Sequence, residues 1–303
     1  MALPVIAITV GDPAGIGPEI ARKAAAAPSV IACCRPVLYG PWREDALGAF
    51  PAGTPTAASG QSAYEAIDSA VRDAREGKVA AIATGPVSKE ALAMAGYPWK
   101  GHTDLLAHLT GASRVAMMFW SPRLRVVLAT VHLPLSEVPA ALTAEKLRDA
   151  VELSHLELPK FGVPSPRIGV AALNPHAGEG GLMGHEEDSV MRPAIAAMRT
   201  EGIDVTGPFP ADTLFVRAAR GEFDVIVAAY HDQGLIPVKL LGFGAAVNVT
   251  LGLPIIRTSV DHGTAYDIAG KNQADEGSLI EAVMLAARLA GGPLPPPTHR
   301  IGP

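Results

Sequence analysis

The chain has 303 residues, of which 49% are hydrophobic and only 5% aromatic, and its formal net charge is -5. This length suits one large α/β domain or two smaller lobes, and the charge excludes a broad basic surface for nucleic acid or an anionic membrane. We therefore expect a globular enzyme in which any anion site is local.

Cysteine and the first residues bear on the compartment. Cys33 and Cys34 are adjacent, so they can form neither a disulfide framework nor a spaced metal site. The first apolar run stops at Gly11 and Asp12, which is too short for a signal peptide or a membrane span. We therefore expect a cytoplasmic protein with no membrane or nucleic-acid partner.

Short apolar runs that end in Gly, Pro or Asp are typical of buried parallel strands. They cover residues 5–10, 79–84, 124–130, 167–173 and 224–230. Stretches rich in Ala and Leu with helical spacing lie between them, at 61–77, 143–160, 187–201 and 276–290. This alternation predicts an α/β fold with functional residues beyond the strand ends. Residues 51–60 and 291–300 are predicted to be surface loop or a frayed end.

The segment 11–20, GDPAGIGPEI, follows the first predicted strand and is expected to open a helix. It resembles a nucleotide-binding turn but matches neither the GxGxxG pattern nor a P-loop. Its glycines could instead shape a tight junction, with Pro18 at the helix start. The sequence leaves both interpretations open.

Three histidines, His132, His176 and His231, follow predicted strands by one to three residues. A single histidine in such a place is more typical of a hydrogen-bonded structural residue. Three equivalent places indicate more, because the imidazoles could converge if the strands share a sheet. A catalytic divalent metal with an open coordination position needs such a ligand set, and we predict one here.

A second group of polar residues lies in strongly apolar surroundings. Its members are His102, Thr103, Lys239, Asn248 and Arg257. Lysine and arginine usually lie on solvated faces, but a charge in an apolar environment is costly unless a partner such as a phosphate satisfies it. These residues are therefore the predicted substrate-binding anion site.

Three acids are candidates for proton transfer or for orienting a metal-bound histidine: Asp212, Asp232 and Asp261. Helix-cap and turn roles are the alternative for each of them. The predicted catalytic residues are Asp212 and Lys239.

These motifs together resemble the 4-hydroxythreonine-4-phosphate dehydrogenase family of pyridoxal phosphate biosynthesis. The resemblance covers nearly the whole chain, in family order, through ITVGDPAGIGPEI, ATGPVSKEAL, GHTD, ATVHLPL, LNPHAGEGG, GPFPADTLF, YHDQGLIPVK and NVTLGLPIIRTSVDHGTAYDIAGK. It implies a two-lobed α/β fold related to isocitrate and isopropylmalate dehydrogenases, with the active site in the cleft between lobes and no Rossmann domain. The implied lobes are residues 1–125 plus 262–303, and residues 126–261 with the metal ligands and dimer contacts.

The resemblance also implies a reaction and a ligand set. The C3 alcohol of 4-(phosphooxy)-L-threonine would be oxidised by NAD or NADP to a 3-keto acid, which loses CO₂ to give 3-amino-2-oxopropyl phosphate. His132, His176 and His231 would hold one divalent zinc, magnesium or cobalt ion, with one ligand supplied across the interface of a homodimer. The substrate would contact His102, Thr103, Lys239, Asn248 and Arg257, whereas no residue is assigned to the cofactor.

Two departures from the family pattern bear on the substrate: the segment between Gly40 and Gly60 is shorter, and Asp104 stands where Glu is usual. A 4-phospho-D-threonate or 4-phospho-D-erythronate dehydrogenase is therefore an alternative. Aromatic cis-dihydrodiol carboxylate dehydrogenases fit less well, because they tend to lose the His-Thr and Asn positions that this chain keeps. Outside the dehydrogenases, a metal-dependent phosphatase or a phospho-metabolite binding protein would also use a phosphate pocket.

Overall fold

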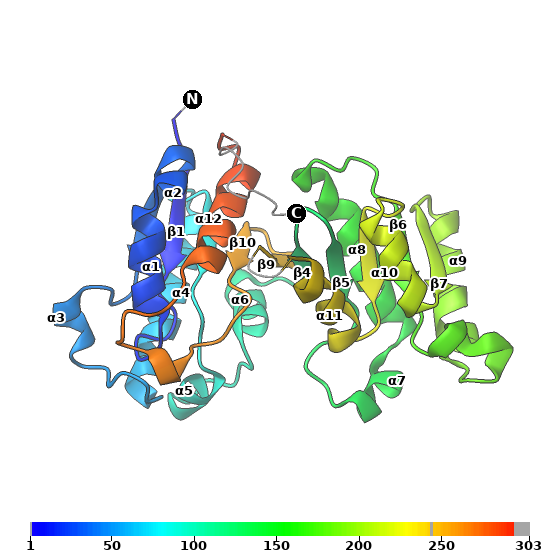
Figure 1. The fold of residues 1–303 in the computed structure, drawn as a ribbon, viewed down its shortest axis with the longest axis horizontal. Coiled ribbons are helices and arrows are strands. Elements are labelled where there is room, and N and C mark those ends of the chain that lie inside the picture. Colours follow the sequence, from blue (N-terminus) through cyan, green and yellow to red (C-terminus); the bar gives the residue numbers. More distant parts are fainter. Residues whose placement is uncertain (1, 243–244, 294–303) are drawn as a thin grey trace. The chain divides into compact units, whose positions relative to one another are not determined.

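A computed structural model describes residues 2–242 and 245–293, and the chain divides into two compact units (Figure 1). Unit 1 comprises Met1–Ser113 and Leu253–Pro303, and unit 2 comprises Arg114–Gly252. These borders differ from the expected lobes of 1–125 plus 262–303 and 126–261. The reason is strand pairing, since β4 (Ala116–Trp120) pairs with strands of unit 2, and β10 (Arg257–Ser259) pairs with β3 (Ala81–Thr84) of unit 1.

Unit 1 contains a parallel sheet in the order β2-β1-β3-β10. Its strands are β1 (Val5–Thr9), β2 (Arg35–Tyr39), β3 (Ala81–Thr84) and β10 (Arg257–Ser259). Its helical elements are α1 (Gly17–Ala26), α2 (Pro28–Cys33), α3 (Glu44–Leu47), α4 (Ala57–Arg75), α5 (Lys89–Met94), α6 (His102–Thr110), η5 (Tyr266–Ile268) and α12 (Gly277–Leu289). Ile6, Ile8 and Ile82 are fully buried, which explains why these strands read as continuous apolar runs.

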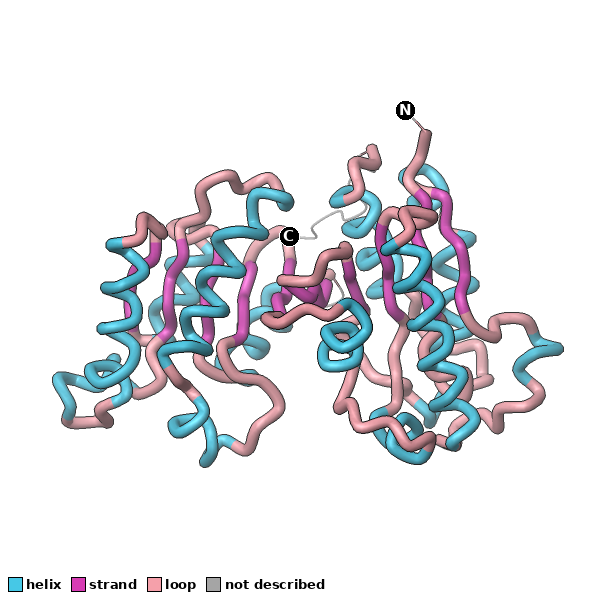
Figure 2. The backbone as a smooth tube through the Cα atoms, turned by 180° about the vertical axis from the view of Figure 1, so that it is seen from behind, coloured by secondary structure: helices cyan, strands magenta, loops and turns pink. Residues whose placement is uncertain are grey.

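Unit 2 contains a mixed sheet in the order β9-β4-β5-β8-β6-β7. Its strands are β4 (Ala116–Trp120), β5 (Arg125–Leu128), β6 (Ile168–Ala171), β7 (Val205–Phe209), β8 (Val225–Ala228) and β9 (Val247–Leu251). Its helical elements are η1 (Leu135–Glu137), α7 (Val138–Ala141), α8 (Ala144–Glu157), η2 (Leu158–Phe161), η3 (Pro175–Gly181), η4 (Glu187–Met191), α9 (Arg192–Thr200), α10 (Ala211–Ala219) and α11 (His231–Gly242). Strand β4 runs antiparallel to both of its neighbours, β5 and β9. The other pairs, β5 with β8, β8 with β6 and β6 with β7, are parallel. Figure 2 shows helices flanking the strands within each unit.

The predicted α/β alternation is confirmed. The five predicted strands are β1, β3, β5, β6 and β8, although β5 also pairs antiparallel with β4. The predicted loop 51–60 is wrong in its last residues, because α4 begins at Ala57. Thr56 caps this helix: its hydroxyl accepts a hydrogen bond from the Ser59 amide, and the Ser59 hydroxyl accepts one from the Thr56 amide.

The turn between β1 and α1 is a closely packed junction. A Cβ atom at Gly17 would lie 1.8 Å from the carbonyl oxygen of Val10, and one at Gly15 would lie 2.8 Å from that of Thr264. Pro18 lies in the first turn of α1, where no amide donor is needed. Of the two interpretations of this segment, the contacts therefore support the tight junction.

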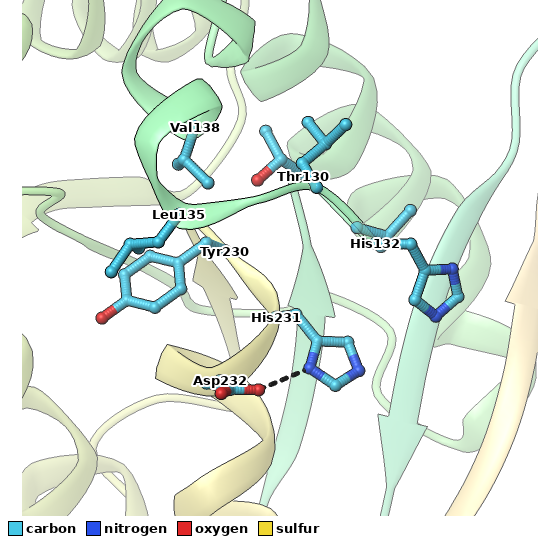
Figure 3. A pocket seen from close by; sticks show the side chains of 9 residues that line it. Thr130, His132, Leu135, Val138, Tyr230, His231 and Asp232 are labelled. Carbon is cyan, nitrogen blue, oxygen red and sulfur yellow. Dashed lines mark hydrogen bonds and ion pairs between the residues drawn. The ribbon is translucent and has the colours of Figure 1, made fainter.

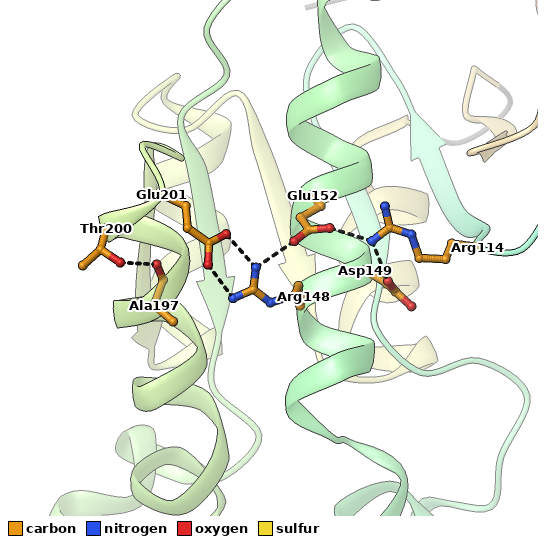
Figure 4. Close-up of polar contacts among 7 residues, drawn as sticks. All are labelled: Arg114, Arg148, Asp149, Glu152, Ala197, Thr200 and Glu201. Carbon is orange, nitrogen blue, oxygen red and sulfur yellow. Dashed lines mark hydrogen bonds and ion pairs between the residues drawn. The ribbon is translucent and has the colours of Figure 1, made fainter.

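A chain of ion pairs joins α8 to α9 on the surface of unit 2 (Figure 4). The Arg148 guanidinium makes two hydrogen bonds to Glu201, of 2.7 and 2.9 Å, and one of 2.8 Å to Glu152. Glu152 also accepts a hydrogen bond of 2.6 Å from Arg114. The forked Arg148–Glu201 contact links α8 to the residue that follows α9.

No described helix is both long and apolar enough to cross a membrane.

The close packing of α4 on α5 predicts the effect of Gly60→Ala. A Cβ at Gly60 would lie 2.0 Å from the Ala91 carbonyl oxygen, so we expect the free energy of unfolding to fall by about 1–3 kcal/mol. Alanine would otherwise favour a helix by about 1 kcal/mol. Urea unfolding measures the change, with Gly263→Ala as the control because a Cβ there meets nothing within 4 Å. Equal stability of Gly60→Ala and wild type would contradict this packing.

Candidate active site

Unit 2 has a pocket of about 380 Å³ at the ends of two neighbouring parallel strands (Figure 3). Strands β5 and β8 pair with Leu128 opposite Ala228, so the segments that follow them leave the sheet side by side. The pocket is lined by Thr130, Val131, His132, Leu133, Leu135, Val138, Tyr230, His231 and Asp232. Polar side chains thus gather beyond the strand ends, as the fold class predicts.

His132 and His231 face this pocket together. Their ring centroids are 5.6 Å apart, and Figure 3 shows Asp232 on the side of the His231 ring away from His132. The His231 Nδ1 atom lies 2.7 Å from Asp232 Oδ1, which leaves Nε2 available to a ligand. A carboxylate in this position fixes the orientation of a metal-binding imidazole. Two imidazoles in an open pocket fit a zinc or cobalt ion better than magnesium, which prefers oxygen ligands.

His176 does not join this pair within one chain. It lies exposed on η3, after β6, and is not among the pocket residues. Across residues 2–242 and 245–293, no group of three His, Cys, Asp or Glu side chains is arranged to hold a metal ion. One copy of the chain therefore brings together two of the three predicted metal ligands.

Two residues that the sequence did not single out hold this region in place. The Thr130 hydroxyl donates a 2.7 Å hydrogen bond to the Ala229 carbonyl, which ties the segments after β5 and β8 together. The Gln233 amide group donates to the Ala172 carbonyl and accepts from the Ala229 amide, both at 2.7 Å. Gln233 thus links the ends of β6 and β8. Thr130 is the polar residue at the end of the apolar run 124–130 in the sequence. This position is the signal that could have identified it.

Unit 1 brings together two of the predicted anion-binding residues. Arg257 is only 2% exposed, and its Nη2 and Nε atoms donate to the Thr84 hydroxyl at 2.7 and 3.2 Å. Burial lowers the pKa of Arg257 to about 9. Burial and the charge of Arg257 also hold the pKa of His102 well below its ordinary value. Thr103 follows His102, half-buried in the first turn of α6.

The polar atoms around Arg257 suit an anion. The His102 Nε2 atom is buried and has no hydrogen-bond partner among the described residues. An anion beside it would satisfy this nitrogen and offset the cost of burying the guanidinium. Thr84, which the sequence also did not single out, orients Arg257 and hydrogen-bonds to Ser259 at 2.9 Å.

The other predicted substrate residues belong to unit 2. Asn248 lies in β9, and its Oδ1 atom is buried with no partner in the part of the chain that the structure describes. Lys239 is exposed in the last turn of α11. The five predicted contacts are thus shared between the two units, three from unit 1 and two from unit 2.

The candidate acids differ in their surroundings. Asp212 is exposed in the first turn of α10, where its Oδ1 accepts a 2.9 Å hydrogen bond from the Thr213 amide. Asp261 is half-buried, and its backbone amide donates to Ser278. Asp232 contacts His231, a predicted metal ligand, which fits an orienting role.

The chain has a mixed α/β fold, two histidines together beyond strand ends, and a buried guanidinium beside an imidazole. These are features of a metal-dependent enzyme for an anionic substrate. Residues 21–286 match the family described as pyridoxal phosphate biosynthetic protein PdxA. The chain belongs to this family.

Its relatives carry two different names. A 4-hydroxythreonine-4-phosphate dehydrogenase from Geobacter metallireducens is 47% identical over 95% of this chain and 96% of the relative. A D-threonate 4-phosphate dehydrogenase from Cupriavidus necator is 46% identical over 95% and 98%. The crystal structure of a 4-hydroxythreonine-4-phosphate dehydrogenase from Klebsiella pneumoniae is 40% identical, with a TM-score of 0.87 over 95% of this chain and 98% of that chain.

A more distant likeness concerns the fold alone. A β-decarboxylating dehydrogenase from Thermococcus kodakarensis is 16% identical, with a TM-score of 0.51 over 95% of this chain and 84% of that chain. The mixed α/β fold is therefore shared beyond the family.

The lowered pKa of His102 predicts how stability depends on pH. The folded state keeps this imidazole neutral, whereas the unfolded chain protonates it near its ordinary pKa of about 6.5. Stability should therefore fall as the pH drops below that value, and His102→Gln should weaken this dependence. Urea unfolding between neutral and mildly acidic pH measures both slopes, with His108→Gln, an exposed histidine of the same helix, as control. Equal slopes for His102→Gln and wild type would refute the assignment.

Proposed function

We propose that this protein oxidises the C3 alcohol of 4-(phosphooxy)-L-threonine with NAD or NADP, giving a 3-keto acid that loses CO₂ to form 3-amino-2-oxopropyl phosphate. Family membership and the names of the relatives support this reaction. The single structural observation that carries it is buried Arg257 beside half-buried His102, whose Nε2 atom is buried and lacks a partner among the described residues. A phosphate group would satisfy both side chains.

The metal site would be shared between two copies of the chain. His132 and His231 would come from one subunit and His176 from the partner subunit, since the first two lie together and the third lies apart. A divalent ion held there would polarise the C3 oxygen and stabilise negative charge on it. Asp232 would keep the His231 ring in the orientation that presents Nε2.

The protein's own groups would position the substrate. Arg257, His102 and Thr103 of unit 1 would hold the phosphate, and Lys239 and Asn248 of unit 2 would contact the rest of the molecule. The phosphate serves as a remote handle, whose binding free energy orients C3 for loss of hydride. Lys239 and Asp212 are the candidates for accepting the alcohol proton. The two units would then act as the lobes of a fold like that of isocitrate dehydrogenase, without a Rossmann domain, in a cytoplasmic homodimer.

A second candidate substrate is 4-phospho-D-threonate. The C. necator relative with that name is 46% identical, against 47% for the G. metallireducens relative, so overall similarity does not separate the two. Both substrates carry the phosphate and differ at C2, where one has an amino group and the other a hydroxyl. A phosphatase or a binding protein, by contrast, would produce no NAD(P)H from either.

Arg257→Ala should impair phosphorylated substrates selectively. Losing a charge-assisted contact to a buried phosphate costs roughly 1.5–3 kcal/mol, which is about a tenfold to hundredfold loss in kcat/KM. A dephosphorylated analogue lacks that contact, so its poor turnover should change little. NAD(P)H formation measures both substrates, and Arg257→Lys, which keeps the charge, should recover part of the loss. An equal loss on both substrates would assign Arg257 to the fold instead.

Mixed dimers test the shared metal site. His132→Ala and His176→Ala should each be inactive alone, yet a dimer of one with the other should contain one intact site, because a three-ligand site draws on both subunits. Activity after subunit exchange measures this. His132→Ala mixed with His231→Ala is the matched control and should regain nothing, since both residues come from the same side of the site. Recovery in the control, or none in the first mixture, would contradict the arrangement.

A further inference from the structure

The segment that carries His176 has an unusual backbone. Residues 176–180 all have positive φ angles, from 43° to 81°, and three of them are not glycine. His176, Ala177 and Glu179 therefore adopt a left-handed conformation that side chains with a Cβ rarely take. Such strained stretches persist only where the surrounding structure holds them, and they cluster at functional sites.

A buried carboxylate holds this segment from within. Glu187 is 1% exposed. Its Oε1 accepts a 2.7 Å hydrogen bond from the Asn174 backbone amide, and its Oε2 accepts one of 2.9 Å from the Asn174 side-chain amide. The same side-chain amide also donates to Glu186 at 2.7 Å. Both oxygens of Glu187 are thus bound to the residue two positions before His176.

The left-handed segment closes tightly around this contact. A Cβ at Gly178 would lie 2.9 Å from Glu187 Oε2, and one at Gly184 would lie 2.3 Å from the Asn174 side-chain nitrogen. Glu187 itself begins the π-helical turn η4, a rare conformation that often marks functional sites. Asn174 and Glu187 therefore form the centre about which residues 174–184 fold.

We propose that Glu187 is a positioning residue for the metal site: by clamping Asn174, it holds the left-handed turn that projects His176 outward, towards the ion shared with the partner subunit. This inference rests on the proposed role of His176 as a ligand. The backbone of the segment is partly buried, at Ala177 and Gly178, whereas His176 itself is exposed. A turn that is already fixed keeps the imidazole in place for metal binding. The conformational entropy of ordering the segment then does not reduce the binding free energy of the ion.

The test compares Glu187→Gln with Asp188→Asn in the purified dimer. Asp188 is the matched control, because it lies next in sequence and is also acidic, but its side chain pairs with Arg192 on the surface and makes no hydrogen bond to Asn174 among the described residues. Glutamine keeps the size of Glu187 but turns an amide towards the amide of Asn174, so one hydrogen bond is lost. We expect Glu187→Gln to weaken Co²⁺ binding, followed by the visible absorption of the ion, about 10- to 100-fold. Asp188→Asn should bind Co²⁺ like wild type.

Two further measurements separate positioning from general instability. Hydrogen exchange of the peptide that spans 174–184 should rise in Glu187→Gln without metal, while the exchange of β6 and β8 and the thermal midpoint stay close to wild type. Activity of Glu187→Gln should return at high Co²⁺ concentration. If exchange rises but Co²⁺ affinity is unchanged while His176→Ala weakens it, the inference on Glu187 is overturned and the proposed ligand stands. If His176→Ala leaves the affinity unchanged, the proposed ligand assignment fails instead.

Discussion

The burial of one guanidinium group is the constraint on which the first unit depends. Arg257 lies in β10, is 2% exposed and uses the Thr84 hydroxyl as a partner across the β3–β10 pair. A charge in such an environment is costly, and its pKa of about 9 expresses that cost. The neighbouring imidazole of His102 stays neutral for the same reason. In the proposed function, a bound phosphate would offset this cost.

The parallel pairing of strands in unit 2 determines where the candidate metal ligands lie. Because β5, β8 and β6 are neighbours and run in the same direction, the chain segments after them emerge at one edge of the sheet. Thr130 and Gln233 then tie these segments together through backbone carbonyl and amide groups. This arrangement fixes His132 and His231 near each other, whereas His176 is held by a separate support built on Asn174 and Glu187.

Much of the fold was predictable because the central strands are apolar on both faces. The missed strands are β2, β4, β7, β9 and β10. Two of them lack a buried apolar run: β2 has half-exposed and exposed positions, and β10 is three residues long and contains Arg257. The start of α4 was missed because Thr56 and Ser59 read as loop residues although they form a capping box. The glycines of 11–20 fitted two interpretations of the sequence. The structure supports the tight junction, because a Cβ atom on Gly17 would lie 1.8 Å from the Val10 carbonyl oxygen.

The sequence could propose residue types for the site but not its geometry. Spacing after strands identified three histidines, yet no periodicity shows that five residues in a row after Pro175 turn left-handed and keep His176 away from the other two. The roles of Thr84 and Glu187 depend on contacts between segments far apart in sequence or across a turn, which a sequence pattern does not contain.

The most direct test of the proposed site is a crystal structure of the dimer with Co²⁺ and inorganic phosphate, with diffraction data collected at the cobalt absorption edge. The account predicts one ion within about 2.0–2.2 Å of nitrogen atoms of His132, His231 and the partner subunit's His176, with phosphate against Arg257. An ion bound elsewhere, or bound without a contribution from the second copy, would contradict it.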